Sequence, residues 1–83
     1  MNKLADTSRH SKIVIHINNK LDDQHRSQFS NGVSQLDGVV SAALQEKCPQ
    51  LMIVAYNPLK TQAVKVVNGI RNIGMPAQLI SWL

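Results

Sequence analysis

Hydrophobic residues recur with regular spacing along most of this chain. Ile13, Ile15 and Ile17 alternate with other residues, which is the period of two that a strand with one buried face produces. We therefore predict a strand over residues 12–17 whose isoleucines point into the core. Residues 1–11 are polar and have no such period, and we predict that they form a flexible tail.

A helical period follows this strand. Phe29, Val33 and Leu36 recur at intervals of four and three residues, which places them on one face of a helix. Asp22 suits the N-cap, because its short side chain can accept a hydrogen bond from a backbone amide of the first turn. Gly38 suits the left-handed conformation in which many helices end. The pattern thus predicts a helix between these two residues.

Two apolar segments with β propensity come next, residues 39–45 and residues 51–56. The turn between them, residues 46–50, contains a proline, so we predict a β-hairpin. Asn57 and Pro58 are typical of a helix start, with Asn as the cap and Pro at the first helical position, where its missing N–H is not needed.

The second helix is predicted to end at Gly74, and residues 77–83 then form the last strand. In that strand we place Gln78, Ile80 and Trp82 on the face opposite to Leu79. The apolar residues that form the buried stripe of the second helix are Ala63, Val66, Val67, Ile70 and Ile73.

The predicted elements follow the order βαββαβ with short connections. This is the split βαβ arrangement, in which right-handed crossovers place both helices on one face of a four-stranded antiparallel sheet. The fold class is therefore α+β, a ferredoxin-like βαββαβ sandwich formed by residues 12–83. The other face of the sheet is left open.

Composition limits the domain count and the location of the chain. Its 83 residues, 43% of them hydrophobic, suffice for one small domain. The single Cys excludes an internal disulfide, and no signal-like apolar segment follows Met1. No apolar run approaches the roughly 18 to 20 residues that cross a bilayer. We expect a cytoplasmic protein that does not insert into membranes.

The net charge of +4 does not predict nucleic-acid binding, because the nine Lys and Arg residues are scattered singly. No Ser or Cys stands with a base at a recognisable spacing, no glycine-rich phosphate loop is present, and the adjacent carboxylates of Asp22 and Asp23 would not face one another on a helix. We therefore expect neither a nucleic-acid partner nor an enzyme.

Several short segments together resemble the heavy-metal-associated (HMA) domain family. They are residues 15–17 (IHI), 36–39 (LDGV), 54–58 (VAYNP), 70–75 (IRNIGM) and 77–79 (AQL), and they follow the order and spacing of that family. The family includes small copper and mercury carriers and the N-terminal modules of metal-pumping ATPases. The resemblance implies a ferredoxin-like fold and a metallochaperone-like role in metal binding and transport.

The defining motif of that family, Gly-Met-x-Cys-x-x-Cys, is absent from this chain. Counting back from Gly38 at the family's spacing puts the two cysteine positions at Asp22 and His25, and the Gly-Met positions at Asn19 and Lys20. Because two soft thiolates are what grip Cu(I) or Hg(II), their absence argues against that chemistry here. The resemblance then implies a degenerate metal site.

Asp22 and His25 offer an oxygen and an imidazole to a divalent ion such as Zn(II), Cu(II) or Ni(II). The topology brings the 46–50 turn and the 74–75 loop to the same end of the sheet, which makes Cys48 and Met75 candidate further ligands. The alternative is that Asp22 only caps the helix, that His25 is solvated and that no metal is bound. Cys48 is then either a reactive thiol or a residue without a role.

The open sheet face is a third candidate site. If the isoleucines of the first strand face the helices, an apolar patch is predicted on the other side, with Trp82 as its anchor. Alternatively, the inner and outer faces of one strand are swapped, or the N-terminal tail folds back to cover the patch. The residues assigned to this interface are Val14, His16, Ile53, Ala55, Ile80 and Trp82.

Two functions follow from these observations. The first is an HMA-type metal-handling domain with an atypical first loop and weak, non-thiolate binding, acting as an accessory of a metal-transport protein. The second is a metal-free interaction module that dimerises or docks through its open sheet face.

Overall fold

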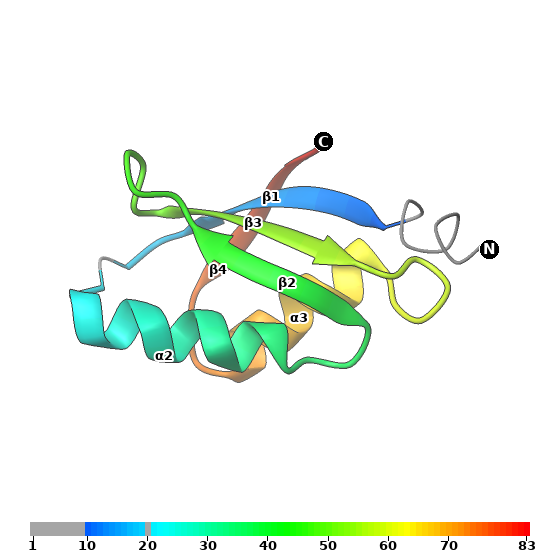
Figure 1. Cartoon of the computed structure of the whole chain (residues 1–83), viewed down its shortest axis with the longest axis horizontal. Helices are drawn as coiled ribbons and strands as arrows, with labels where there is room; N and C mark the ends of the chain where they lie inside the picture. The colour runs from blue at the N-terminus through cyan, green and yellow to red at the C-terminus, as the bar shows by residue number, and fades with distance from the viewer. Residues whose placement is uncertain (1–9, 20) are drawn as a thin grey trace, which may run out of the picture.

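The computed structural model describes residues 10–19 and 21–83 (Figure 1). The order of elements is βαββαβ, as predicted. Of the predicted tail, residues 1–9 lie outside the described residues, and Ser11 already belongs to the first strand. The elements are β1 (Ser11–Ile17), α2 (Asp23–Ser34), β2 (Val39–Leu44), β3 (Leu51–Tyr56), α3 (Ala63–Asn72) and β4 (Ala77–Trp82).

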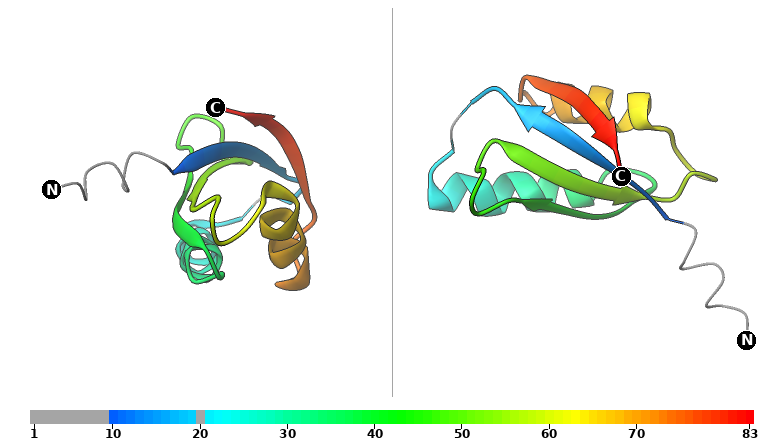
Figure 2. Two further views of the ribbon diagram at one scale, coloured as in Figure 1. Left: turned by 90° about the vertical axis from the view of Figure 1, so that its right-hand side faces the viewer. Right: turned by 90° about the horizontal axis from the view of Figure 1, so that it is seen from above.

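The four strands form one antiparallel sheet in the order β2-β3-β1-β4. Both helices lie against the same face of this sheet, as the end-on view of Figure 2 shows. The α+β, ferredoxin-like architecture expected from the sequence is therefore confirmed. Neither helix among the described residues has the length and apolarity that a membrane span requires.

The core lies between the sheet and the two helices. Ile13 pairs with Val54 and Ile15 pairs with Met52 across β1 and β3, and all four side chains are fully buried. Because directly opposite residues of antiparallel strands share a face, this register fixes which side of the sheet is apolar. The predicted inward orientation of the isoleucines is correct. The helices close the core with Phe29, Val33, Val66, Val67 and Ile70.

The link between α2 and β2 turns at Gly38, whose φ of +83° lies in the left-handed region that suits glycine. A Cβ added there would lie 2.8 Å from the Cβ of Thr61. Thr61 is itself buried, and the N–H of Asn57 donates to the carbonyl of Gly38 at 2.8 Å. This glycine therefore lets two loops pack closely.

The prediction that Asn57 and Pro58 start the second helix is wrong. The amides of Lys60 and Thr61 donate to the carbonyl of Asn57 at 2.9 and 3.1 Å, which closes an isolated turn, and α3 starts only at Ala63. The physical reason is tertiary, because the chain leaves the turn to bury Thr61 against Gly38. Packing here overrides a local helix signal.

The predicted alternation of β4 also fails, at a bulge. Ile15 pairs with Leu79, yet Ile13 pairs with Trp82, so one extra residue, Ile80, is inserted between the two stretches of the ladder. The bulge reverses the alternation, so Trp82 shares the helix-covered face of Ile13. The prediction that Trp82 lies on the open face is therefore wrong.

Candidate functional site

The loop after β1 lies where three connections of the fold meet. The N–H of Ile17 donates to the carbonyl of Gln50 at 2.7 Å, and the N–H of Asn18 donates to that of Pro76 at 3.0 Å. These bonds tie the end of β1 to the β2–β3 turn and to the α3–β4 loop. The predicted convergence of these loops at one end of the sheet is correct. Lys20, in the expected Gly-Met position, lies outside the described residues.

Asp22 caps α2 and also holds the ring of His25. Its backbone is extended, and its Oδ1 accepts a hydrogen bond from the backbone N–H of His25 at 2.9 Å. The same oxygen lies 2.7 Å from His25 Nδ1. Both side chains are largely exposed, at 67% for Asp22 and 62% for His25. The expected cap is confirmed, and it is joined to the imidazole.

These bonds keep the Asp22 carboxylate ionised and set the tautomer of a neutral His25 ring. The backbone N–H of His25 and then its ring hold the pKa of Asp22 below its ordinary value of 3.8. The carboxylate is therefore ionised at neutral pH and only accepts hydrogen bonds. Nδ1 must then carry the proton that it shares with Asp22, so the Nε2 atom of a neutral His25 keeps its lone pair for a ligand.

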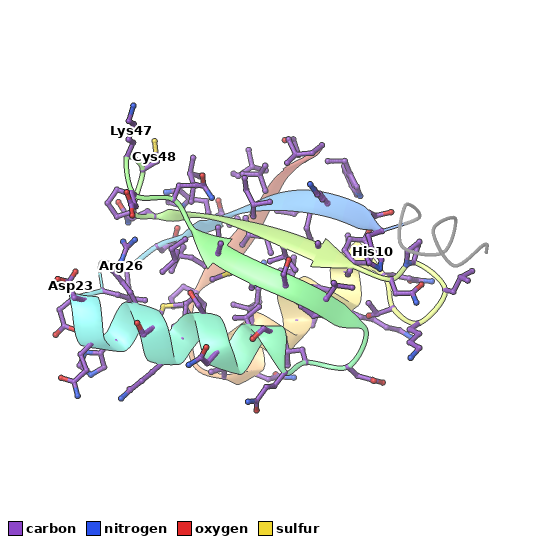
Figure 3. The ribbon with its side chains drawn as sticks, in the orientation of Figure 1. His10, Asp23, Arg26, Lys47 and Cys48 are labelled. Carbon is purple, nitrogen blue, oxygen red and sulfur yellow. The ribbon has the colours of Figure 1, made fainter. Side chains whose placement is uncertain are left out.

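Cys48 does not join this pair. It lies with Lys47 at the tip of the β2–β3 turn, and Figure 3 shows it projecting away from α2. The turn is closed by a hydrogen bond from the N–H of Leu51 to the carbonyl of Cys48 at 2.8 Å, and the thiol is exposed. Met75 packs against the hydrophobic core instead.

Within residues 10–19 and 21–83, no group of three or more His, Cys, Asp or Glu side chains is placed to hold a metal ion. The predicted set of Asp22, His25 and Cys48 is therefore not brought together. The short hairpin turn explains this, because it directs Cys48 away from α2, whereas the His25 ring is bonded to Asp22 at the start of that helix. Asp22 and His25 remain as a pair.

His16 presents a second oriented imidazole, which sequence reasoning assigned only to an interface. Its Nδ1 lies 2.8 Å from Asn18 Oδ1. It stands on the open face, opposite Leu51 of β3 and Gln78 of β4. The alternation of β1 placed His16 on the correct face, but nothing in that pattern predicted its bond to Asn18.

The open face carries part of the predicted apolar patch. Val14 lies opposite Ile53, and both are half-buried. Ala55 lies on the same face but is only 6% exposed, so it offers little surface. Ile80, at the bulge, is 54% exposed. Because Trp82 is on the other face, the patch lacks its expected anchor.

Trp82 contributes to a different surface, at the end of the sheet away from the first loop. It is 63% exposed and borders a cavity of roughly 280 Å³. Sequence reasoning missed this placement because it follows from the bulge. The other residues that line the cavity are Tyr56, Pro58, Thr61, Gln62, Ala63 and Val64.

No protein-family model matches the chain, and no curated protein matches it by sequence. Solved structures do match it. A copper-binding domain from HMA7, a P-type ATPase, superposes with a TM-score of 0.77 at 14% identity, covering 87% of this chain and 96% of that one. The copper chaperone of Enterococcus hirae gives 0.70 at 18% identity, covering 82% and 98%. Oxidized MerP from Ralstonia metallidurans gives 0.72 at 13% identity, covering 84% and 96%.

These similarities show the fold. The chain has the HMA-like ferredoxin fold of metal-binding domains and chaperones, and it spans nearly the whole length of each of these three structures. Two of the structures that share this fold are named as a copper chaperone and as the CopZ metallochaperone.

Proposed function

We propose that this chain is a small metal-handling module of the HMA type that offers an imidazole, in place of thiolates, at the first turn of α2. The observation that carries the proposal is the Asp22–His25 pair, in which the carboxylate orients the ring and leaves Nε2 free to bind. The fold supports the proposal, because structures that share it are named as a copper chaperone and as the mercury-bound form of MerP.

The donor atoms favour a borderline divalent ion. An imidazole nitrogen with a neighbouring carboxylate suits Zn(II), Cu(II) or Ni(II), whereas Cu(I) and Hg(II) prefer the thiolates that Asp22 and His25 replace. Two protein donors fall short of the three or four that hold a structural zinc ion. We therefore expect weak binding, with the remaining positions filled by water or by a metal-transport protein that shares the ion.

Calorimetric titration with Zn(II), Cu(II), Ni(II) and Cu(I) tests the proposal. At least one divalent ion should bind with a Kd below about 1 mM, and His25→Ala should weaken that binding at least tenfold, or about 1.4 kcal/mol. His16→Ala is the matched control, since it removes another imidazole held by an oxygen acceptor. The proposal fails if no divalent ion binds in this range, or if both variants lose affinity equally.

Substitution of the carboxylate separates orientation of the ring from simple charge attraction. Asp22→Ala removes both the negative charge and the oxygen that accepts from the His25 ring, and we expect it to lower divalent affinity about tenfold or more. Asp23→Asn removes the same charge from the next residue without touching the His25 ring. Equal losses in these two variants would show that only local charge matters, which would contradict the proposed role of the pair.

A metal-free interaction module is the second candidate, favoured by the adjacent Val14 and Ile53 side chains on the open face. Sedimentation equilibrium with a chelator present should then show self-association that Ile53→Glu abolishes. Trp82→Ala serves as the control, because Trp82 lies on the other face. A monomer at all concentrations would exclude the homodimer.

A further inference from the structure

Strand β2 lies at an edge of the sheet, and two of its residues direct their backbone groups away from β3. The N–H of Gln45 donates to the carbonyl of Leu51 at 2.9 Å, so this pair is hydrogen-bonded. Hydrogen-bonded and non-hydrogen-bonded pairs alternate along an antiparallel ladder. Ala43 lies two residues before Gln45, so its backbone N–H and C=O groups also face β3. The N–H and C=O groups of Ala42 and Leu44 therefore point outward. Within the described residues, no strand pairs with that side of β2.

This edge lacks the side chains that usually discourage strand addition. β2 reads VVSAAL, with no charged residue and no proline, whereas natural edges are commonly protected by lysine or proline. The register shifts between Val39 and Ser41, which bounds the regular edge on one side. The β2–β3 turn bounds it on the other. A short, uncharged stretch of free edge remains at residues 41–44.

A groove of roughly 410 Å³ runs beside this edge, between β2 and α2. Arg26 supplies the only charged side chain in its lining, and Figure 3 shows Arg26 rising from α2 toward the strand layer. The other side chains that α2 contributes to the lining are small and polar, which leaves room for an incoming side chain. The lining residues are Arg26, Ser27, Ser30, Asn31, Ala42, Ala43 and Leu44.

We propose that the β2 edge accepts an extended acidic segment of a partner protein as a fifth strand, with a carboxylate of that segment directed into the groove at Arg26. The backbone groups of Ala42 and Leu44 would supply the ladder hydrogen bonds. Their side chains lie on the core side of the sheet. Because opposite residues share a face, the partner residues opposite them point toward α2.

Charge complementarity selects an acidic segment over the other occupants. A carboxylate can accept two parallel hydrogen bonds from the guanidinium of Arg26, and the chain carries a net charge of +4. A second copy of this chain also carries a net charge of +4, and its own β2 contains no carboxylate. A basic segment would place like charge beside Arg26.

NMR titration of the ¹⁵N-labelled full chain tests this inference with three capped peptides, Thr-Val-Glu-Val-Thr and its central Gln and Lys versions. The Glu peptide should bind at least tenfold more tightly than the Lys peptide, and added salt should reduce the difference. Amide shifts should concentrate at Ala42, Leu44 and residues 26–31. Equal affinities, shifts confined to the open face, or self-association through β2 without peptide would overturn the inference.

Three variants sharpen the test. Arg26→Gln should abolish the preference for Glu over Gln, whereas Lys47→Gln, which removes a cation from the neighbouring turn, should preserve it. Ala42→Pro removes an outward N–H without removing a donor to β3. It should weaken the binding of the Glu peptide at least tenfold. If Ala42→Pro does not fold, the Arg26→Gln and Lys47→Gln pair still decides, because equal effects of these two would overturn the inference.

Discussion

Asp22 and His25 are joined by two hydrogen bonds that end on the same carboxylate oxygen. The backbone N–H of His25 lies 2.9 Å from Asp22 Oδ1, and the ring Nδ1 lies 2.7 Å from it. The group that caps the helix is therefore also the group that orients the imidazole. A change at Asp22 should act on helix stability and on ligand geometry together.

The pH dependence of stability should reveal this cap. The folded state lowers the pKa of Asp22 below 3.8. At pH values between the folded-state and unfolded-state pKa of this residue, the unfolded chain therefore binds more protons than the folded chain. The contribution of Asp22 is thus fully present above about pH 5 and is lost as the pH falls through the lowered pKa. Urea midpoints between pH 2 and 6 should fall less steeply for Asp22→Asn than for wild type.

Asp23→Asn provides the control for that comparison, because Asp23 is an exposed carboxylate one residue further along. We expect it to leave most of the acid-induced loss in place. If Asp22→Asn and Asp23→Asn flatten the pH dependence to the same extent, the two hydrogen bonds to His25 are not its cause.

Gly38→Ala should lower the free energy of unfolding markedly. The alanine would have to adopt a left-handed backbone conformation, and its Cβ would lie 2.7 Å from Thr61 Cγ2. Left-handed strain alone costs of order 1 kcal/mol, and the clash adds to it. Gly74→Ala is the matched control, with a φ of +105° but no atom within 4 Å of its added Cβ. Chemical denaturation should show a clearly larger loss for Gly38→Ala, and a reversed order would contradict the packing described here.

The two faces of β1 should respond differently to truncation. Ile15 is fully buried, so Ile15→Ala should cost about 2–5 kcal/mol through lost burial and the cavity left behind. Val14 is half-buried on the open face, and Val14→Ala should cost about 1 kcal/mol. Urea unfolding measures both. Similar losses of unfolding free energy in the two variants would contradict the burial of only one face of β1 in the core.

Deletion of Ile80 tests the bulge in β4. Removing this residue leaves Leu79 opposite Ile15 and Trp82 opposite Ile13, so every core pairing is kept. We expect a folded protein in which the single Trp keeps its fluorescence spectrum. Deletion of Val14, from the regular part of central strand β1, reverses the faces of its neighbours and should prevent folding. A deletion of Ile80 that unfolds the protein would contradict the register.

Much of the fold could be predicted because its signals are periodic and local. The isoleucines of β1 alternate, and Phe29 and Val33 recur at a helical interval, and both sets are buried as expected. Asp22 was recognised as a cap because a short acceptor before a helical pattern needs no distant partner. The helix start expected at Asn57 failed because a buried Thr61 outweighed the local signal.

The candidate site was less predictable, since spacing gives proximity along the chain and not direction in space. The sequence alone determined the βαββαβ order and the absence of the thiolate pair, and it put Asp22 and His25 one helical turn apart. Only the tertiary structure decided that Cys48 projects away from them and that a bulge moves Trp82 to the helix-covered face. It also left β2 as a free edge beside Arg26. The physical reason is that such directions depend on strand register and turn closure, which arise when segments distant in sequence pack together.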